Sequence, residues 1–299
     1  MRLELRNVGQ LEEAVVEFGD LTVLVGPQAS GKSIFLQFLK LMVDGPTIVA
    51  DLRRYGYDWG GQLPAFLNLY LGEGMQAVWR AAGDTPSAAS WNDAAGGLDT
   101  RLRAFSRVRS DKRKERMFFI PAQRVLSLGM GWPRPFTDFS VGDPYVVPSF
   151  SEKLRMLMEA GLGWGKDARI FPHPGRLKSE LRAALDAAVF HGFSLRLDRV
   201  GGVQKRLVLS SSDGSGESLP YMVWSAGQRE FVPLLLGLYR LCPSTRIARR
   251  DVLEWVVVEE PEMGLHPEAI SVVMLVVLEL LWRGYRVVLS THSPHVLDV

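Results

Sequence analysis

The sequence has little cysteine, almost no charge bias and no long uninterrupted apolar segment. Its single cysteine, Cys242, excludes a disulfide framework within the chain, so a reducing, cytoplasmic setting fits best. The net charge of +2 is too small to indicate nucleic-acid binding by itself. The most apolar stretch, 270–282, contains Glu279 and is shorter than the ~20 residues that a membrane-spanning helix needs. A role within a membrane is therefore not expected.

The composition is that of a globular protein. Of 299 residues, 47% are hydrophobic and 23% are charged, which allows one large domain or two small ones. The first five residues alternate between charged and apolar side chains, without the apolar core of a signal peptide.

The two ends of the chain show a regular alternation of strand and helix patterns. This alternation predicts an α/β fold with a mostly parallel core sheet. At the two ends, strands are expected at 2–6, 13–18, 21–25, 255–258 and 286–290, and helices at 33–41, 228–241 and 267–282; one further strand is expected at 118–120, in the middle of the chain.

The middle of the chain is less regular. Helices are expected at 66–82, 151–162 and 176–191, irregular loops at 83–97 and 129–150, and an antiparallel β meander at 194–198, 206–210 and 219–223. We therefore expect a single domain over 1–299. Its core would come from 1–45 and 221–299, with a helical and β region, 46–220, inserted between them.

The clearest motif is a glycine-rich loop between a strand and a helix. It satisfies G-x-x-x-x-G-K-[ST] and consists of Gly26, Pro27, Gln28, Ala29, Ser30, Gly31, Lys32 and Ser33. Backbone N–H groups of such a loop cradle phosphates, Lys32 would reach the β- and γ-phosphates, and Ser33 would ligate Mg²⁺. The loop predicts ATP and Mg²⁺ as ligands but does not select among P-loop enzyme classes.

Two adjacent carboxylates follow a buried strand. The strand would carry Glu259 toward the magnesium and Glu260 to its carboxyl end, where ligands bind in open α/β sheets. Glu260 would then act as the base that polarises the attacking water.

A short segment and a histidine are also candidates for the site because of their order in the chain. Ser225, Gly227 and Gln228 open a predicted helix, whose start can bind an anion, although a simple helix cap explains the same residues. His292 follows the last predicted strand, 292 − 259 = 33 residues after Glu259, and its imidazole could bind a γ-phosphate.

Taken together, these residues resemble the ABC class of ATPases. Residues 26–33 look like its Walker A motif, 256–260 like its Walker B motif and 224–228 like its L-S-G-G-Q signature. His292 looks like its switch histidine, and Gln123 like its Q-loop glutamine. The E-E-P-E-x-x-L-H-P pattern at 259–267 and the T-H-S-P pattern at 291–294 are most similar to the OLD (overcoming lysogenisation defect) family, a relative of SMC and DNA-repair ATPases.

The resemblance implies a P-loop ABC-type ATPase that clamps two ATP molecules in a head-to-tail dimer. Ser225, Gly227 and Gln228 would contact the γ-phosphate held by Lys32 of a second copy. Catalysis would involve Glu260, His292, Lys32 and Gln123, and the metal would be held by Ser33, Gln123 and Glu259. The chain departs from the pattern at Trp224, Ala226 and Gln28, and has Glu259 where many relatives have Asp.

OLD nucleases continue beyond the histidine into a TOPRIM nuclease domain. Since 293–299 contain no such carboxylate cluster, we expect no nuclease activity in this chain, and a partner or further domain to supply it. The segment from Arg101 to Arg116 has eight basic and two acidic residues (8 − 2 = +6), so it is a candidate for DNA phosphates or simply a solvated surface. Other phosphate contacts considered are Arg53, Arg54 and Arg124.

Three functions are compatible with these motifs. The first is an ATP-driven dimeric clamp in DNA repair or anti-phage defence, acting with a nuclease. The second is an ATP-dependent sensor or scaffold that holds a protein effector without touching DNA. The third, the nucleotide-binding subunit of a transporter, is disfavoured because the spacing between motifs is long for such a subunit.

Overall fold

The protein is described here by a computed structural model that covers residues 1–93, 97–108, 114–162, 168–173, 175–200, 204–211, 218–242 and 252–298. Its strands are β1 (Arg2–Val8), β2 (Leu11–Glu17), β3 (Leu21–Val25), β4 (Ala88–Trp91), β5 (Met117–Ile120), β6 (Leu128–Gly129), β7 (Trp132–Pro133), β8 (Arg169–Phe171), β9 (Phe193–Val200), β10 (Gln204–Ser211), β11 (Ser218–Pro220), β12 (Trp255–Glu259) and β13 (Arg286–Thr291). The α-helices are α1 (Lys32–Arg54), α2 (Leu63–Leu71), α3 (Leu98–Arg107), α4 (Val146–Glu159), α5 (Ser179–Leu185), α6 (Ala226–Leu241) and α7 (Pro267–Trp282).

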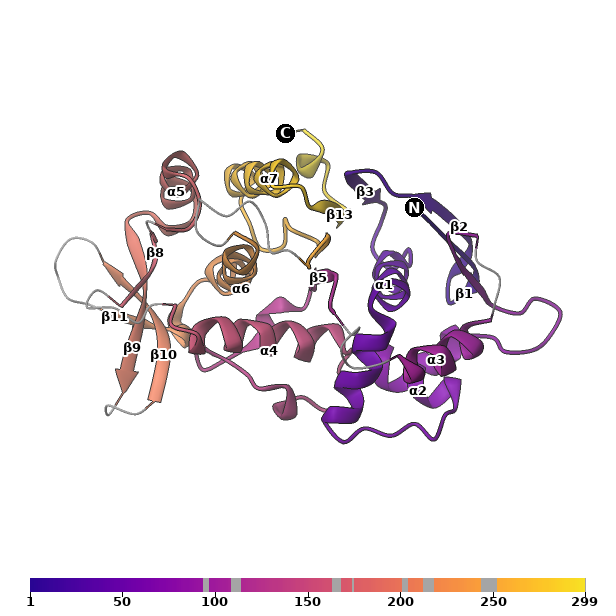
Figure 1. The fold of residues 1–299 in the computed structure, drawn as a ribbon. Helices are drawn as coiled ribbons and strands as arrows, with labels where there is room; N and C mark the ends of the chain where they lie inside the picture. The colour runs from indigo at the N-terminus through magenta and orange to yellow at the C-terminus, as the bar shows by residue number, and fades with distance from the viewer. Residues whose placement is uncertain are drawn as a thin grey trace.

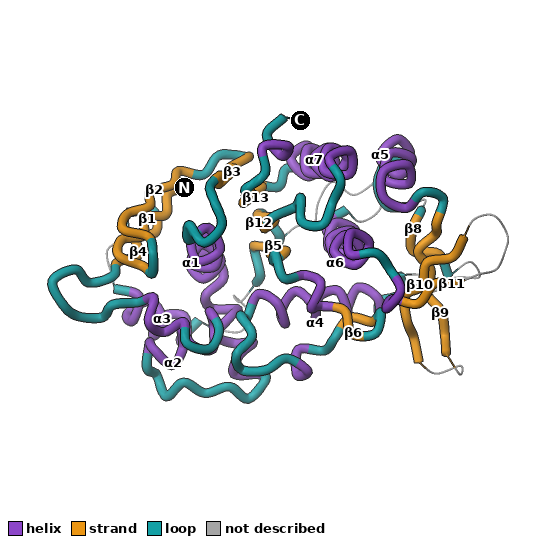
Figure 2. Tube along the Cα trace, turned by 180° about the vertical axis from the view of Figure 1, so that it is seen from behind, coloured by secondary structure: helices purple, strands orange, loops and turns teal. Residues whose placement is uncertain are grey.

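A four-stranded parallel sheet of order β3-β13-β12-β5 forms the centre of the molecule. Helix α1 covers one face, and α6 and α7 cover the other (Figures 1 and 2). Side chains alternate between the faces along β12, as strand geometry requires. Trp255 and Val257 join the hydrophobic core on the α1 side, whereas Val256 and Val258 join the core on the α6–α7 side.

Two antiparallel sheets stand at opposite ends of the molecule (Figure 1). One has the order β2-β1-β4 and carries the N-terminus, and the other has the order β11-β10-β9-β8. The predicted fold class, a parallel α/β core with an antiparallel β part and helices, is confirmed.

The boundaries of the core differ from the expected ones in two places, after residue 45 and at residues 117–120. Strand β5 lies at the edge of the parallel sheet, paired with β12, although it belongs to the segment expected as an insertion. Helix α1 runs on to Arg54, past Gly45 and Pro46, by way of a kink at Asp44 (φ −121°, ψ 18°). The kink accommodates Pro46, which cannot donate the hydrogen bond of a regular helix.

The expected helix at 66–82 and loop at 83–97 are partly wrong. Helix α2 ends at Leu71 because Gly72 adopts φ 110°, a conformation that L side chains rarely take. Within the expected loop, β4 pairs with β1 along Ala88–Trp91, and its Trp91 ring lies 6.3 Å from that of Trp255. Tertiary packing creates this short edge strand, which its small residues did not predict.

The expected boundaries also shift in the second half. Helix α4 begins at Val146, inside the loop expected at 129–150, since Pro148 occupies the first turn, where N–H groups lack helical partners. The helix expected at 176–191 divides into α5 and a π-helical turn at Asp186–Phe190. The last meander strand, β11, stops at Pro220.

A buried charge cluster connects α1, α4 and the segment before β5. Lys40, with a side chain 2% exposed, donates to Asp44 (2.6 Å) and Glu115 (2.7 Å), and Lys153 also donates to Glu115. Burial acts to raise the pKa of Glu115, but the ammonium groups of Lys153 and Lys40 outweigh it and lower this pKa to about 2. Asp44 in turn accepts from the N–H groups of Arg116 and Met117, which fixes the entry into β5.

We expect Asp44→Ala to lower the free energy of unfolding by about 3–5 kcal/mol, because Lys40 loses a partner in a buried site. Urea denaturation at neutral pH measures this loss. The matched control, Asp99→Ala, breaks the exposed pair between Asp99 and Arg103 and should cost less than about 0.5 kcal/mol. Equal effects of the two variants would contradict a structural role for the cluster.

Candidate active site

The four parallel strands end at one edge of the sheet, and each is followed by a motif. Residue 26 follows β3, Gln123 lies shortly after β5, Glu260 follows β12 and His292 follows β13. Two backbone hydrogen bonds join the motifs beyond the strands: Gly26 N–H donates to the Thr291 carbonyl (3.3 Å) and Glu260 N–H to the Ser290 carbonyl (2.9 Å). The sheet register therefore brings the sequence motifs into one site.

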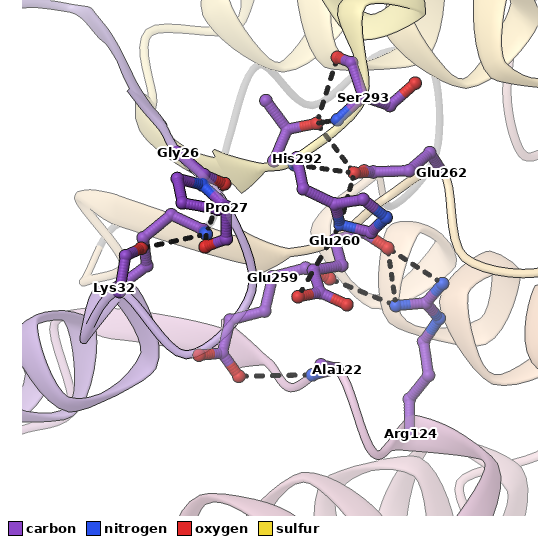
Figure 3. Close-up of polar contacts among 12 residues, drawn as sticks. Gly26, Pro27, Lys32, Ala122, Arg124, Glu259, Glu260, Glu262, His292 and Ser293 are labelled. Atoms are coloured by element: carbon purple, nitrogen blue, oxygen red, sulfur yellow. Dashed lines mark hydrogen bonds and ion pairs between the residues drawn. The ribbon is translucent and has the colours of Figure 1, made fainter.

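The phosphate loop forms a pocket whose volume, including its open mouth, is about 470 Å³. Lys32 Nζ donates to the carbonyls of Gly26 (2.7 Å) and Pro27 (2.6 Å) and to Ser30 Oγ (3.2 Å) (Figure 3). The ammonium group thus lies across the loop at the start of α1, where a phosphate would meet it. The pocket is lined by Gln10, Gln28, Ala29, Ser30, Gly31, Lys32, Ser33, Ile34 and Glu260.

Gly31 is required by both conformation and space. Its φ is 90°, and a Cβ there would lie 2.7 Å from Leu11 Cδ2. The neighbouring residue Gln10 donates to the Ala29 carbonyl (2.9 Å) from the turn between β1 and β2. We did not predict Gln10 as a site residue, since nothing in the sequence indicated that this turn packs on the phosphate loop.

Glu259 is a buried carboxylate with an incomplete set of partners. Its side chain points to the α1 face, in keeping with the alternation along β12, and Oε2 accepts from Ala122 N–H (3.1 Å). Oε1 is buried and has no hydrogen bond of regular geometry, although the Ser33 hydroxyl is near enough to lower the pKa. Burial is the larger effect and raises the pKa of Glu259 to about 7.

Glu260 adopts the left-handed backbone region, with φ 44°. This conformation costs about 1–2 kcal/mol for an L residue and is enriched at functional sites. It brings the Glu260 carboxylate to the rim of the pocket, 3.8 Å from His292 Nδ1.

His292 is held by a neighbour that the sequence analysis did not assign. Glu262 Oε1 accepts from Thr291 Oγ1 (2.6 Å) and from His292 N–H (3.1 Å), and lies 3.4 Å from His292 Nδ1 (Figure 3). Glu262 is the third acidic residue of the E-E-P-E pattern, and its burial at the end of β13 was not evident from that pattern alone.

Arg124 does not reach the pocket, contrary to the phosphate contact considered above. Its side chain is fully buried and donates to the carbonyls of Glu230, Glu259 and Glu260, at 3.1–3.2 Å. Gln123, its neighbour, has an exposed side chain and does not line the pocket, whereas the N–H of the preceding residue, Ala122, donates to Glu259.

The predicted signature forms the start of α6, on the other side of the sheet from α1. Ser225 and Gln228 form a reciprocal capping box, with Gln228 N–H donating to Ser225 Oγ (3.2 Å) and Ser225 N–H to Gln228 Oε1 (3.0 Å). A Cβ on Gly227 would lie 2.6 Å from the Gly264 carbonyl, so Gly227 is needed for packing within the chain. Of these residues, none lines the phosphate pocket of the described chain.

The residues present suit a magnesium ion held together with a nucleotide. Ser33 and Glu259 offer hard oxygen ligands, and Glu259 Oε1 is a buried acceptor without a regular partner. In the described ranges, no group of three or more His, Cys, Asp or Glu side chains could hold a metal ion by itself. Mg²⁺ commonly binds through one or two protein oxygens plus phosphates, which fits this pair.

Residues 160–298 match one protein family. Its model is described as "AAA domain, putative AbiEii toxin, Type IV TA system". The matched segment contains the carboxylate pair Glu259–Glu260, the signature and His292. Among curated proteins, none matches this chain.

Solved structures resemble the whole chain in fold. An SMC head bound to the C-winged helix domain of ScpA has 11% identity and a TM-score of 0.50, covering 99% of this chain and 90% of its own. The SMC head domain from Thermotoga maritima has 12% identity and a TM-score of 0.40, covering 99% and 90%. An ATP-binding cassette in a dimeric, post-hydrolysis state with ADP and Pi has 12% identity and a TM-score of 0.41, covering 98% and 89%.

The AAA-domain match supports a nucleotide-binding ATPase, and the SMC-head likeness supports the fold. They do not distinguish the OLD family from its relatives. Helix α1 is the single described helix that is long and apolar enough to cross a membrane, but 72% of its apolar window is buried, as in the core helix of a globular protein.

The raised pKa of Glu259 predicts a measurable stability effect. The native protein holds this proton more tightly than the unfolded chain, whose carboxyl titrates near 4.5, so stability is lost as pH rises from about 4.5 to 7. At pH 8, Glu259→Gln should therefore be more stable than the natural protein, by up to about 3 kcal/mol. Thermal melts without Mg²⁺ at pH 5 and 8 measure the difference, which should nearly vanish at pH 5; a constant difference would contradict burial as its cause.

Proposed function

We propose that this chain is a single ATPase domain that binds Mg²⁺-ATP and hydrolyses it as a head-to-tail dimer. One observation carries the proposal: the phosphate pocket and the signature residues lie on different sides of one chain. A second copy would bring Ser225 and Gly227 over the triphosphate held by Lys32. Two-fold symmetry completes both sites at once, because the same surface is used by each copy.

Each residue has a proposed role that follows from its position. Lys32 and the loop N–H groups bind the β- and γ-phosphates, and Ser33 and Glu259 hold Mg²⁺, which would neutralise phosphate charge when bound. Glu260 at the pocket rim accepts the proton of the attacking water, and His292 donates to the γ-phosphate. Gln123, which follows the Ala122 that donates to Glu259, would support the metal and water once nucleotide is bound.

Lys32→Ala should abolish nucleotide binding, because it removes the cation that lies across the loop. Glu260→Gln should retain binding but lower turnover by on the order of 100-fold, since the amide cannot accept a proton. Phosphate release measures turnover, and titration with a non-hydrolysable analogue measures affinity. Size exclusion detects a trapped dimer. A Glu260→Gln variant with unaltered turnover would show that another group is the base.

Mixing two inactive variants tests the shared site directly. Lys32→Ala removes the loop half of each site, and Ser225→Phe blocks the signature half while weakening the α6 cap by about 1 kcal/mol. A mixed dimer contains one intact site, so an equal mixture should regain about a quarter of the natural activity. Failure to regain any activity, with both variants folded and exchanging subunits, would contradict the dimeric site.

We further propose that ATP turnover drives a switch in DNA repair or anti-phage defence, with a nuclease or other effector as partner. A group of basic side chains on α3 favours DNA as the partner. Helix α3 carries Arg101, Arg103 and Arg107, and Arg53 of α1 donates to Ser106 beside them. Arg116 is less suited, since it is paired with Glu254 (2.6 Å). Residues 109–113 of the basic segment lie outside the described residues.

Charge reversal of this surface provides the test. Arg103→Glu with Arg107→Glu should weaken salt-sensitive binding to duplex DNA by at least roughly tenfold at low salt with Mg²⁺-ATP, through lost phosphate contacts. Arg6→Glu with Arg196→Glu, on the two outer sheets, is the matched control. If the natural protein gives no shift at low salt, the sensor or scaffold that holds a protein effector becomes the preferred function.

A further inference from the structure

Arg124 forms hydrogen bonds both to the candidate catalytic strand β12 with the residue after it and to the signature helix α6. Its side chain is 0% exposed, yet guanidinium stays charged in proteins. NH1 and NH2 donate to the Glu260 carbonyl (3.2 Å each), and NH1 also donates to the Glu259 carbonyl (3.1 Å). Nε donates to the Glu230 carbonyl (3.2 Å) in α6.

These contacts act on a strained peptide. Glu260 has φ 44°, and its carbonyl points away from the sheet ladder toward the guanidinium, whereas its N–H remains bound to Ser290. Hydrogen bonds from a charged donor are stronger than those from a neutral one, so the two bonds from the guanidinium stabilise this conformation over an extended one. With the backbone fixed from both sides, the Glu260 carboxylate has a defined place at the pocket rim (Figure 3).

The charges around Arg124 fit the same role. Its guanidinium lies among the carboxylates of Glu230, Glu259, Glu260 and Glu262, and Glu230 Oε2 is 3.9 Å from Nε. A buried cation in this position lowers the mutual repulsion of adjacent carboxylates. A lysine could not reproduce the arrangement, because one ammonium centre cannot span carbonyls from two elements as the planar guanidinium does.

We propose that Arg124 is a positioning residue that holds the Glu260 backbone in its left-handed conformation and links it to the start of α6. The inference rests on the proposed ATPase function, in which Glu260 is the base. A movement of the signature helix α6 would shift Glu260 through this guanidinium, while the phosphate loop would keep its conformation.

Arg124→Lys and Arg124→Ala provide the kinetic test. Both should leave the affinity for a non-hydrolysable Mg²⁺-ATP analogue within about twofold and lower kcat by roughly 10- to 100-fold, the effect of a misplaced catalytic group. Millimolar guanidinium should restore part of the turnover of Arg124→Ala only. Arg134→Ala is the matched control, since Arg134 also donates to carbonyls, those of Leu126 and Asp138, but away from Glu260; its kcat should stay unchanged, with or without guanidinium.

Amide hydrogen exchange gives a second readout that needs no turnover. In Arg124→Lys, peptides covering 259–264 and 226–232 should exchange faster, while the peptide covering 26–34 should not change. If the natural protein hydrolyses no ATP, the proposed function fails, and exchange still decides the role of Arg124.

Three results would overturn the proposal. The first is an Arg124→Lys variant that turns over ATP within about twofold of the natural rate. The second is a loss of analogue affinity as large as the loss of kcat, which would mean that Arg124 acts on binding. The third is exchange that is unchanged at 259–264, or that rises equally throughout the chain because the variant is globally unstable.

Discussion

The parallel register of β3, β13, β12 and β5 is the constraint on which the site depends. Parallel strands share one carboxyl edge, so four motifs separated by up to 266 residues (292 − 26) arrive side by side. The register also fixes orientation. Because side chains alternate along β12, Glu259 turns toward α1 and Ser33, while the reversal of backbone direction at Glu260 brings the next carboxylate to the pocket rim.

The site combines rigid support with unfavourable local states. Glu259 is ionisable but buried, Glu260 is strained and Arg124 is a buried cation. Each state is costly alone, and each is compensated by the others: the guanidinium opposes the carboxylate charges and binds the strained carbonyl. Bound Mg²⁺ and a nucleotide triphosphate would supply the further charges that suit this arrangement. This is why we connect the site with ATP hydrolysis.

The phosphate pocket and the signature residues lie on different faces of the chain, which is why we propose that a second copy completes the site. The phosphate pocket opens where α1 begins, and the signature caps α6 across the sheet. The likeness to an SMC head, at 11% identity, supports the fold alone. Within the chain, Gly227 already has a packing role against Gly264, so its small size serves the fold whether or not a second copy binds there.

Local patterns in the sequence determined the phosphate loop, the core strands and helices, and the order of the motifs. Loop glycines, apolar runs and a helix cap are short-range signals, which is why α7 has the predicted bounds and α6 starts within two residues of them. Only the tertiary structure decided that β5 joins the core sheet, that Gln10 and Glu262 contact the site, and that Arg124 binds backbone carbonyls instead of phosphate. These features depend on contacts between residues far apart in the chain, and no local pattern encodes which buried carbonyl a given arginine will meet.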